Sequence, residues 1–217
     1  MASKEEIRRY QSRYESGNLP WDIGRVDKNL KNILDSIATT HNKVLEIGCG
    51  TGDNAIFMAR KGLIVTATEI APLALELAKA KAKDHNVNIT FLLTDIIEHD
   101  IPGRPFDLVF DRGCFHHYDT STSRIRFVHR IHEHLGEEGL WLSLIGNADE
   151  QTAGNGPPRL SATDIVTAVE PFFEILLLKS SHFDSNRHPP PRCWLFIGKK
   201  RKGPTQTAPL KSKKTLN

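Results

Sequence analysis

The chain has 217 residues, of which 39% are hydrophobic, which is enough to bury the core of one domain. No stretch reaches the roughly 18 apolar residues of a membrane span, and the first residues, MASKEEIRRY, lack the apolar region of a signal peptide. The tail from Lys199 onward holds seven of the 29 Lys and Arg residues and none of the 26 Asp and Glu, so the body has a net charge of −4, which argues against a broad nucleic-acid-binding face.

The first half of the chain alternates helical and strand patterns. Ser3 and Glu6 match the S-x-x-E capping box, which predicts a helix that ends near Gly17. Short apolar runs bounded by glycine or polar residues predict buried strands between the helical stretches. The expected elements are helices over residues 3–16, 26–37, 53–62 and 72–84, and strands over 43–48, 63–69, 88–93 and 106–110.

The second half continues this alternation. A helix is predicted over 121–135, and another begins near the S-x-x-D pattern of Ser161 to Asp164. Strands are predicted over 139–146, 173–179 and 193–198. Strands that alternate with helices predict a parallel sheet covered on both faces, with its ligand at the carboxyl ends of the strands.

A glycine-rich loop, LEIGCGTGD at residues 45–53, lies between the first strand and its helix. Its G-x-G-x-G spacing differs from the G-x-G-x-x-G of dinucleotide-binding enzymes. Glu46 and Asp53 flank the loop, and their carboxylates would repel a pyrophosphate. The loop therefore predicts a ligand that carries positive charge.

Two further acids follow the next two strands. Glu69 lies nineteen residues after Gly50, where this class of fold places an acid on a ribose diol. Asp95 can accept a hydrogen bond from an exocyclic amine, and Ile96 can contact a base; Asp95 is equally compatible with a helix cap or a solvated strand end. Ribose, adenine and a cationic amino acid together describe S-adenosylmethionine.

VLEIGCGTG with these two acids resembles the class I S-adenosylmethionine-dependent methyltransferases over about residues 40–200. The resemblance implies an α/β, Rossmann-like seven-stranded sheet, mostly parallel with the last strand antiparallel, and helices on both faces. It also implies S-adenosyl-L-methionine as cofactor and S-adenosyl-L-homocysteine as product. The expected cofactor-binding residues are Trp21, Glu46, Gly48, Cys49, Gly50, Thr51, Gly52, Glu69, Ile70, Asp95, Ile96 and Asp111.

Three short motifs bear on the methyl acceptor: LPWDIGR at 19–25, DRGCFHHY at 111–118 and GNGPPR at 154–159. As PWDxGR, FDxxFDRG and GPP they resemble the thiopurine, thiol and halide methyltransferases. That resemblance implies a lid containing Trp21 and a small-molecule soft nucleophile as acceptor, methylated by in-line transfer. The expected acceptor-contacting residues are Asp22, Arg25, Phe115, Tyr118 and Pro157.

Arg112 and His116 are the candidate catalytic residues. A guanidinium at Arg112 would lower the pKa of a thiol, ordinarily about 8.5, although an ion pair with Asp111 or an exposed acid is an alternative. His116 could be a general base oriented by Asp119. The CFHH after DRG differs from the small and aliphatic residues of the thiopurine enzymes, so the identity of the acceptor stays open.

The remaining expectations concern partners and location. HRIHEH at 129–134 lacks the HExxH spacing, so we expect no metal, and three unpaired cysteines indicate a cytoplasmic protein. We expect an N-terminal helical lid over 1–40, a methyltransferase domain over 41–200 and a disordered basic tail over 201–217. A monomer or weak homodimer acting on a small molecule, without a membrane or nucleic-acid partner, is expected. The alternatives are an RNA or protein methyltransferase that docks through the tail, and a cofactor-binding protein without catalysis.

Overall fold

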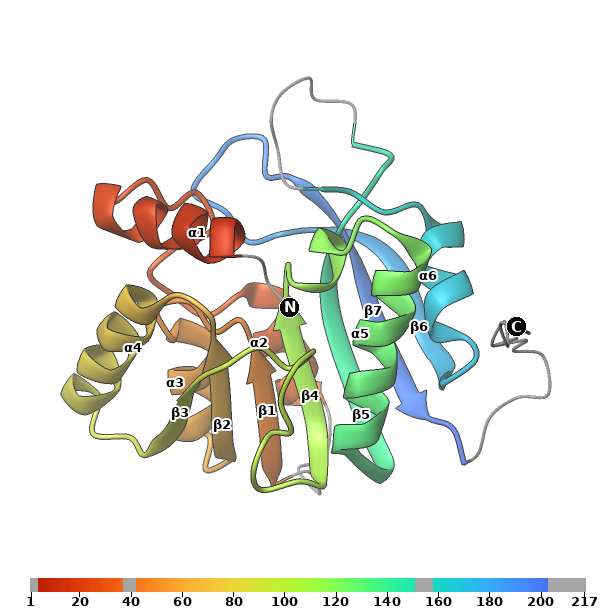
Figure 1. Cartoon of the computed structure of the whole chain (residues 1–217), viewed down its shortest axis with the longest axis horizontal. Coiled ribbons are helices and arrows are strands. Elements are labelled where there is room, and N and C mark those ends of the chain that lie inside the picture. The colour runs from red at the N-terminus through yellow and green to blue at the C-terminus, as the bar shows by residue number, and fades with distance from the viewer. Residues whose placement is uncertain (1–3, 37–41, 151–157, 203–217) are drawn as a thin grey trace, which may run out of the picture.

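The protein is built around one seven-stranded sheet, seen in a computed structural model that describes residues 4–36, 42–150 and 158–202 (Figure 1). The strand order is β3-β2-β1-β4-β5-β7-β6. The strands are β1 (Lys43–Ile47), β2 (Ile64–Glu69), β3 (Ile89–Leu93), β4 (Phe106–Arg112), β5 (Leu135–Gly146), β6 (Phe173–His182) and β7 (Arg192–Lys200).

Neighbouring strands from β3 across to β5 are parallel, and β7 lies antiparallel between β5 and β6. This is the topology that the resemblance implies, and the fold prediction is confirmed. The chain order reverses between β1 and β4, so the carboxyl ends of these two strands form the crevice where such sheets bind ligands.

Helices cover both faces of the sheet, and one further helix lies at its end. Buried residues of α2 and α3 pack with one face, and those of α5 and α6 pack with the other. Figure 1 shows α1 at the end of the sheet toward which β1 and β4 run. The helices are α1 (Lys4–Ser16), α2 (Lys28–Ser36), α3 (Asp53–Arg60), α4 (Pro72–Asp84), α5 (Ser121–His134), α6 (Ala162–Val169) and the short 3-10 helix η1 (Phe115–His117).

The core has two halves because successive residues of a strand point to opposite faces. In β1, Val44 packs in the cluster with α2 and α3, whereas Leu45 packs in the cluster with α5 and α6. Trp141 of β5, fully buried, is the largest side chain of the second cluster. The sheet is therefore held rigidly from both sides, which fixes the positions of its strand ends.

Most predicted elements agree with the structure to within a few residues. Helix α4 covers the predicted range, with Pro72 in its first turn, and Ser161 forms the expected capping box with Asp164. Strand β5 begins at Leu135, earlier than predicted, because Leu135 pairs with Phe106 across a β-bulge. Ser3, the predicted cap of the first helix, and the tail from residue 203 lie outside the described residues.

Within the described ranges, every helix is too short or too polar to cross a bilayer.

Candidate active site

A cavity of about 730 Å³ lies at the carboxyl ends of β1, β2, β3 and β4. Its volume falls inside the range of roughly 300–1,000 Å³ that small-molecule sites occupy. The glycine loop, the ends of β2 and β3, and the segment after β4 form its floor. Helix α1, residues 20–25 and the loop between β6 and β7 complete its wall. The cavity thus sits where the sheet topology predicts a ligand.

Two glycines of the loop are required by both conformation and space. Gly48 and Gly50 have φ angles of 67° and 54°, in the left-handed region that disfavours other residues. A Cβ on Gly48 would overlap Sγ of Cys114, and a Cβ on Gly50 would lie 3.1 Å from the hydroxyl oxygen of Tyr14. Cys114 and Tyr14 therefore pack closely against the loop, which borders the cavity.

Glu69, at the end of β2, connects that strand to the glycine loop. Its Oε2 accepts a hydrogen bond from the backbone N of Gly50 at 2.9 Å, and its Oε1 accepts from Ile70 N at 2.7 Å and Ala71 N at 3.0 Å. Burial raises the pKa of Glu69, and these three donors oppose that effect. The carboxylate is held in one orientation at the cavity wall.

Asp95 follows β3 at the same edge of the sheet. Its Oδ1 accepts a hydrogen bond from Ile97 N at 2.9 Å, which orients the side chain, and Asp95 borders the cavity together with Ile96. The sequence therefore placed two acids at neighbouring strand ends, and the structure brings both to one cavity.

The segment before α2 covers the glycine loop. Oδ2 of Asp22 accepts a hydrogen bond from the hydroxyl of Thr51 at 2.8 Å. Trp21 donates from Nε1 to the hydroxyl of Tyr14 at 3.3 Å, so α1 is attached to the same segment. The hydroxyl of Tyr10 lies 3.0 Å from Nε2 of His117 in η1. Helix α1 thereby contacts the segment over the glycine loop through Tyr14 and contacts η1 through Tyr10.

Comparison with known proteins finds a family that matches the central part of the chain. Residues 44–139 match the family described as a methyltransferase domain. A 2-heptyl-1-hydroxyquinolin-4(1H)-one methyltransferase of Mycobacteroides abscessus is 30% identical over 98 residues, which is 45% of this chain and 43% of that one. Probable thiol methyltransferase 2 of Arabidopsis thaliana is 26% identical over 151 residues, 69% of this chain and 65% of that one. The chain thus spans less than two thirds of the length of either relative.

Solved structures agree on the fold. A SAM-dependent methyltransferase from Methanosarcina mazei superposes with a TM-score of 0.67 at 15% identity, over 77% of this chain and 96% of that one. Residues 44–139 thus match a methyltransferase domain, and the fold of the chain is similar to that of solved S-adenosylmethionine-dependent methyltransferases. That Methanosarcina neighbour is named for its dependence on S-adenosylmethionine as cofactor.

The residues around the cavity fit that cofactor. The glycine loop borders the cavity, and carboxylates stand at the ends of β2 and β3. Of the expected cofactor contacts, those that border the cavity are Trp21, Gly48, Cys49, Gly50, Thr51, Glu69, Ile70, Asp95 and Ile96.

The charge argument drawn from Glu46 and Asp53 is wrong in its detail. Glu46 is 1% exposed and does not border the cavity, and burial raises its pKa to about 8, which favours the neutral carboxyl. Asp53 does border the cavity, but its Oδ1 lies 2.8 Å from Nζ of Lys81. The protein therefore does not present two unpaired carboxylates to its ligand from this loop.

Three more expected contacts lie away from the cavity. Gly52 caps α3 and packs against Ala78 of α4. Asp111 is fully buried: its Oδ1 accepts from Nε1 of Trp141 at 2.9 Å, and its Oδ2 accepts from the backbone N atoms of Cys114 and Phe115. Phe115 belongs to the core, so its assignment to the acceptor pocket, like that of Asp111 to the cofactor, is corrected.

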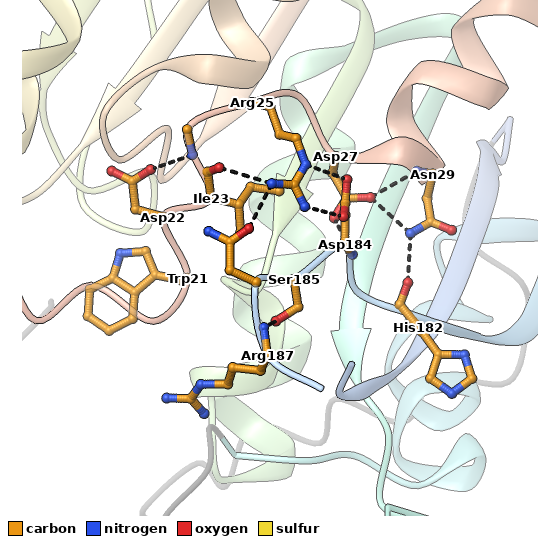
Figure 2. A network of polar contacts seen from close by, with 12 residues as sticks. Trp21, Asp22, Ile23, Arg25, Asp27, Asn29, His182, Asp184, Ser185 and Arg187 are labelled. Carbon is orange, nitrogen blue, oxygen red and sulfur yellow. Dashed lines mark hydrogen bonds and ion pairs between the residues drawn. The ribbon is translucent and has the colours of Figure 1, made fainter. Parts of the chain in front are cut away.

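Arg112 borders the cavity, but its guanidinium is engaged. Its Nε lies 2.8 Å from Oδ2 of the fully buried Asp27, and it donates to the carbonyl oxygens of Trp21 at 3.0 Å and Asp184 at 2.7 Å. The same Asp27 accepts from Asn29, which in turn donates to the carbonyl of His182 (Figure 2). Arg112 is therefore a clamp between β4, the segment that contains Trp21 and the β6–β7 loop. The alternative considered for Arg112, an ion pair with Asp111 or an exposed acid, differs from the structure, in which the partner is the buried Asp27.

Three of the other residues predicted to act at the acceptor site border the cavity, and a fourth lies outside the described residues. Arg25 borders the cavity and pairs with Asp184, 2.8 Å from Nη2 to Oδ1 (Figure 2). Tyr118 borders it as well and stacks on Phe127. His116 borders it, and its Nδ1 accepts a hydrogen bond from the backbone N of Gly146 at 2.7 Å. Pro157 lies outside the described residues.

The arrangement of His116 contradicts its prediction as a general base oriented by Asp119. Nδ1 already accepts a backbone hydrogen, so the hydrogen of the neutral ring is on Nε2. Burial lowers the pKa of His116 well below its ordinary value, so the ring is a poor proton acceptor near neutrality. Among the residues that the structure describes, His116 and Asp119 form no hydrogen bond with each other.

Several residues that complete the site were not predicted from the sequence. Tyr10 and Tyr14 are four positions apart on α1, and this spacing, which places side chains on one helix face, was the available signal. Nothing local indicates Asp27, Phe183 or Asp184, because their partners are remote in the chain. Across the described residues, no three His, Cys, Asp or Glu side chains are placed to hold a metal ion.

Proposed function

We propose that this protein transfers the methyl group of S-adenosylmethionine to a small-molecule soft nucleophile, such as a thiolate or a halide. The observation that carries the proposal is the state of the ionisable side chains in residues 111–118. Asp111 is buried in hydrogen bonds, Nδ1 of His116 accepts from a backbone N–H, and His117 pairs with Tyr10. None of these three is placed to remove a proton, and soft anions need no base.

The cofactor contacts follow from the cavity wall. We assign Glu69 to the ribose hydroxyls, Asp95 to the adenine amine and the backbone around Gly48 and Gly50 to the methionine moiety. When bound, the sulfonium supplies an electrophilic methyl group. The side chains of Ile70 and Ile96, which border the cavity, would contact the base and sugar.

The cover over the cavity supports a mechanism based on alignment and on exclusion of water. The Asp22–Thr51 and Trp21–Tyr14 hydrogen bonds hold the lid segment over the glycine loop. In-line displacement gains most from fixed geometry, which can supply roughly 7–11 kcal/mol of a barrier. We propose that α1 and the segment up to Arg25 act as this lid, whereas α2 packs against the sheet.

The acceptor class also draws on similarity. The Arabidopsis relative is called a probable thiol methyltransferase, and a Brassica oleracea relative, 32% identical over 108 residues, is called a thiocyanate methyltransferase. Cys49, Cys114 and Cys193 are all free thiols, which supports a cytoplasmic location as part of the proposal.

The test is release of S-adenosylhomocysteine from S-adenosylmethionine in the presence of single acceptors. We would compare iodide, hydrosulfide, thiocyanate, small thiols, an aromatic thiol and a thiopurine, with bulk RNA as the counter-screen. Turnover on at least one soft nucleophile, and none on RNA, is the expected result. Turnover on RNA alone, or cofactor binding without any product, would overturn the proposal.

A further inference from the structure

His116 has a fixed orientation and a fixed tautomer. It lies in η1, directly after β4, and its Nδ1 accepts a hydrogen bond from the backbone N of Gly146 at 2.7 Å. A ring nitrogen that accepts a backbone hydrogen carries none of its own, so the hydrogen of the neutral imidazole is on Nε2. The side chain therefore presents one N–H donor on the edge opposite Gly146.

The groups that face His116 keep its ring neutral. It is 3% exposed, and it contacts the ring of His117 at 4.8 Å and the edge of Phe183 at 6.3 Å between centroids. Burial lowers the pKa of His116, and the nearby His117 and Arg112 lower it further. A second proton on this ring would have to be accommodated in a buried site beside a guanidinium.

The Nε2–H group has no hydrogen-bond partner among the described residues, and it is not one of their fully buried unpaired side-chain atoms. Nε2 is therefore accessible from the cavity that His116 borders. Gly113, whose added Cβ would lie 3.5 Å from Nε2, leaves space beside this nitrogen. A ligand in the cavity is therefore the group that can complete its hydrogen bonding.

We infer that Nε2–H of His116 donates a hydrogen bond to the methyl acceptor, which enters the site as an anion with a free lone pair and no proton to lose. This inference rests on the proposed function and restricts its acceptor class. The positive potential of Arg112 at His116 favours an anion at the same place. As the lone pair forms its bond to the methyl carbon, the carbon–sulfur bond breaks, the anion and the sulfonium are both neutralised, and no proton is transferred.

The first test measures the hydrogen bond without turnover. Protein labelled with ¹⁵N-histidine and saturated with S-adenosylhomocysteine is titrated with thiocyanate, an anion at any ordinary pH. We expect the His116 resonances to show the Nε2–H tautomer before titration and a saturable shift of Nε2 and its hydrogen during it. A hydrogen on Nδ1, or no saturable shift of Nε2, would overturn the inference.

The second test uses two matched variants. In His116→Asn the amide oxygen can replace Nδ1 as acceptor for Gly146, but no donor reaches the position of Nε2. In His116→Gln the amide nitrogen can reach that position. For the best anionic acceptor, we expect His116→Asn to lower kcat/KM about 10- to 100-fold, mainly through KM, and His116→Gln to recover part of the loss.

A control variant, and the results expected for other roles of His116, distinguish the donor role from its alternatives. His129→Asn, on the exposed face of α5, should behave as wild type, and cofactor affinity should stay within about twofold in all three variants. Unchanged kinetics in His116→Asn would mean a purely structural histidine, whereas equal loss of kcat in both variants would mean a base; either result overturns the inference. A thiocyanate-dependent Nε2 shift in a protein that methylates nothing would instead refute the proposed function and leave the donor role standing.

Discussion

Nε of Arg112 lies 2.8 Å from Oδ2 of Asp27, a carboxylate that is fully buried 85 residues away in the chain. Asp27 also accepts hydrogen bonds from the backbone N atoms of Asn29 and Asp184. One carboxylate thus joins the start of α2, the end of β4 and the loop between β6 and β7. This clamp holds the cavity wall in place where Arg112 and the β6–β7 loop border it.

Replacing Asp27 with Ala should destabilise the protein strongly, because the guanidinium of Arg112 would stay largely buried without its partner. We expect the free energy of unfolding to fall by about 3–5 kcal/mol, the usual effect of breaking a buried ion pair from one side. Urea denaturation measures it. Asp35→Ala, which removes an exposed pairing with Lys61, is the matched control and should change little; equal effects of the two substitutions would contradict the clamp.

Glu69→Ala should weaken the binding of S-adenosylmethionine. We expect a loss of about 1–3 kcal/mol, the scale of a hydrogen bond to a charged group, together with some loosening of the glycine loop that Glu69 holds through Gly50. Isothermal titration calorimetry gives the affinity. Glu69→Gln keeps the shape of the side chain and one acceptor, so its cofactor affinity should lie between those of the wild type and Glu69→Ala. An unchanged affinity in Glu69→Ala would contradict the ribose assignment.

Gly48→Ala should impair both folding and cofactor binding for two separable reasons. The left-handed φ of 67° costs a non-glycine residue about 1–2 kcal/mol, and the new Cβ would overlap Sγ of Cys114. Removing the sulfur in Gly48→Ala/Cys114→Ala should relieve the overlap and leave the conformational cost. The melting temperatures and cofactor affinities of the two single variants and the double variant measure this; the absence of any rescue would contradict the steric part.

The stability of the protein should depend on His117 at acid pH. Burial, and to a smaller extent Arg9, lower the pKa of His117 to about 4 from an ordinary value of 6.5. A histidine whose folded-state pKa is depressed stabilises the fold fully above pH 6.5, and this contribution is lost as the pH falls toward 4. The difference in unfolding free energy between wild type and His117→Asn should therefore shrink by about 3 kcal/mol between pH 7 and pH 4.

Urea denaturation at several pH values gives that difference. The comparison with the variant removes the contribution of the carboxylates, which titrate in both proteins. A difference that is constant with pH would mean that His117 has the same pKa in the folded and unfolded states.

The helices and strands followed from local patterns, and the mostly parallel seven-stranded sheet followed from the family resemblance. The glycine loop, Glu69 and Asp95 each lie directly beside a strand, and helix α4 extends over its predicted range, because residue spacing and capping depend on neighbours within a few positions. The parallel alternation of strands and helices then determined which edge of the sheet holds the ligand.

The partners of the polar side chains were decided only by the tertiary structure. From the sequence, Arg112 is a candidate catalytic residue with an ion pair to Asp111 or an exposed acid as the alternative, whereas in the folded chain Arg112 pairs with Asp27 and Asp111 bonds to Trp141. His116 owes its tautomer to the backbone of Gly146, thirty residues away. Hydrogen bonding and desolvation depend on which remote segments pack together, and local spacing carries no information about either.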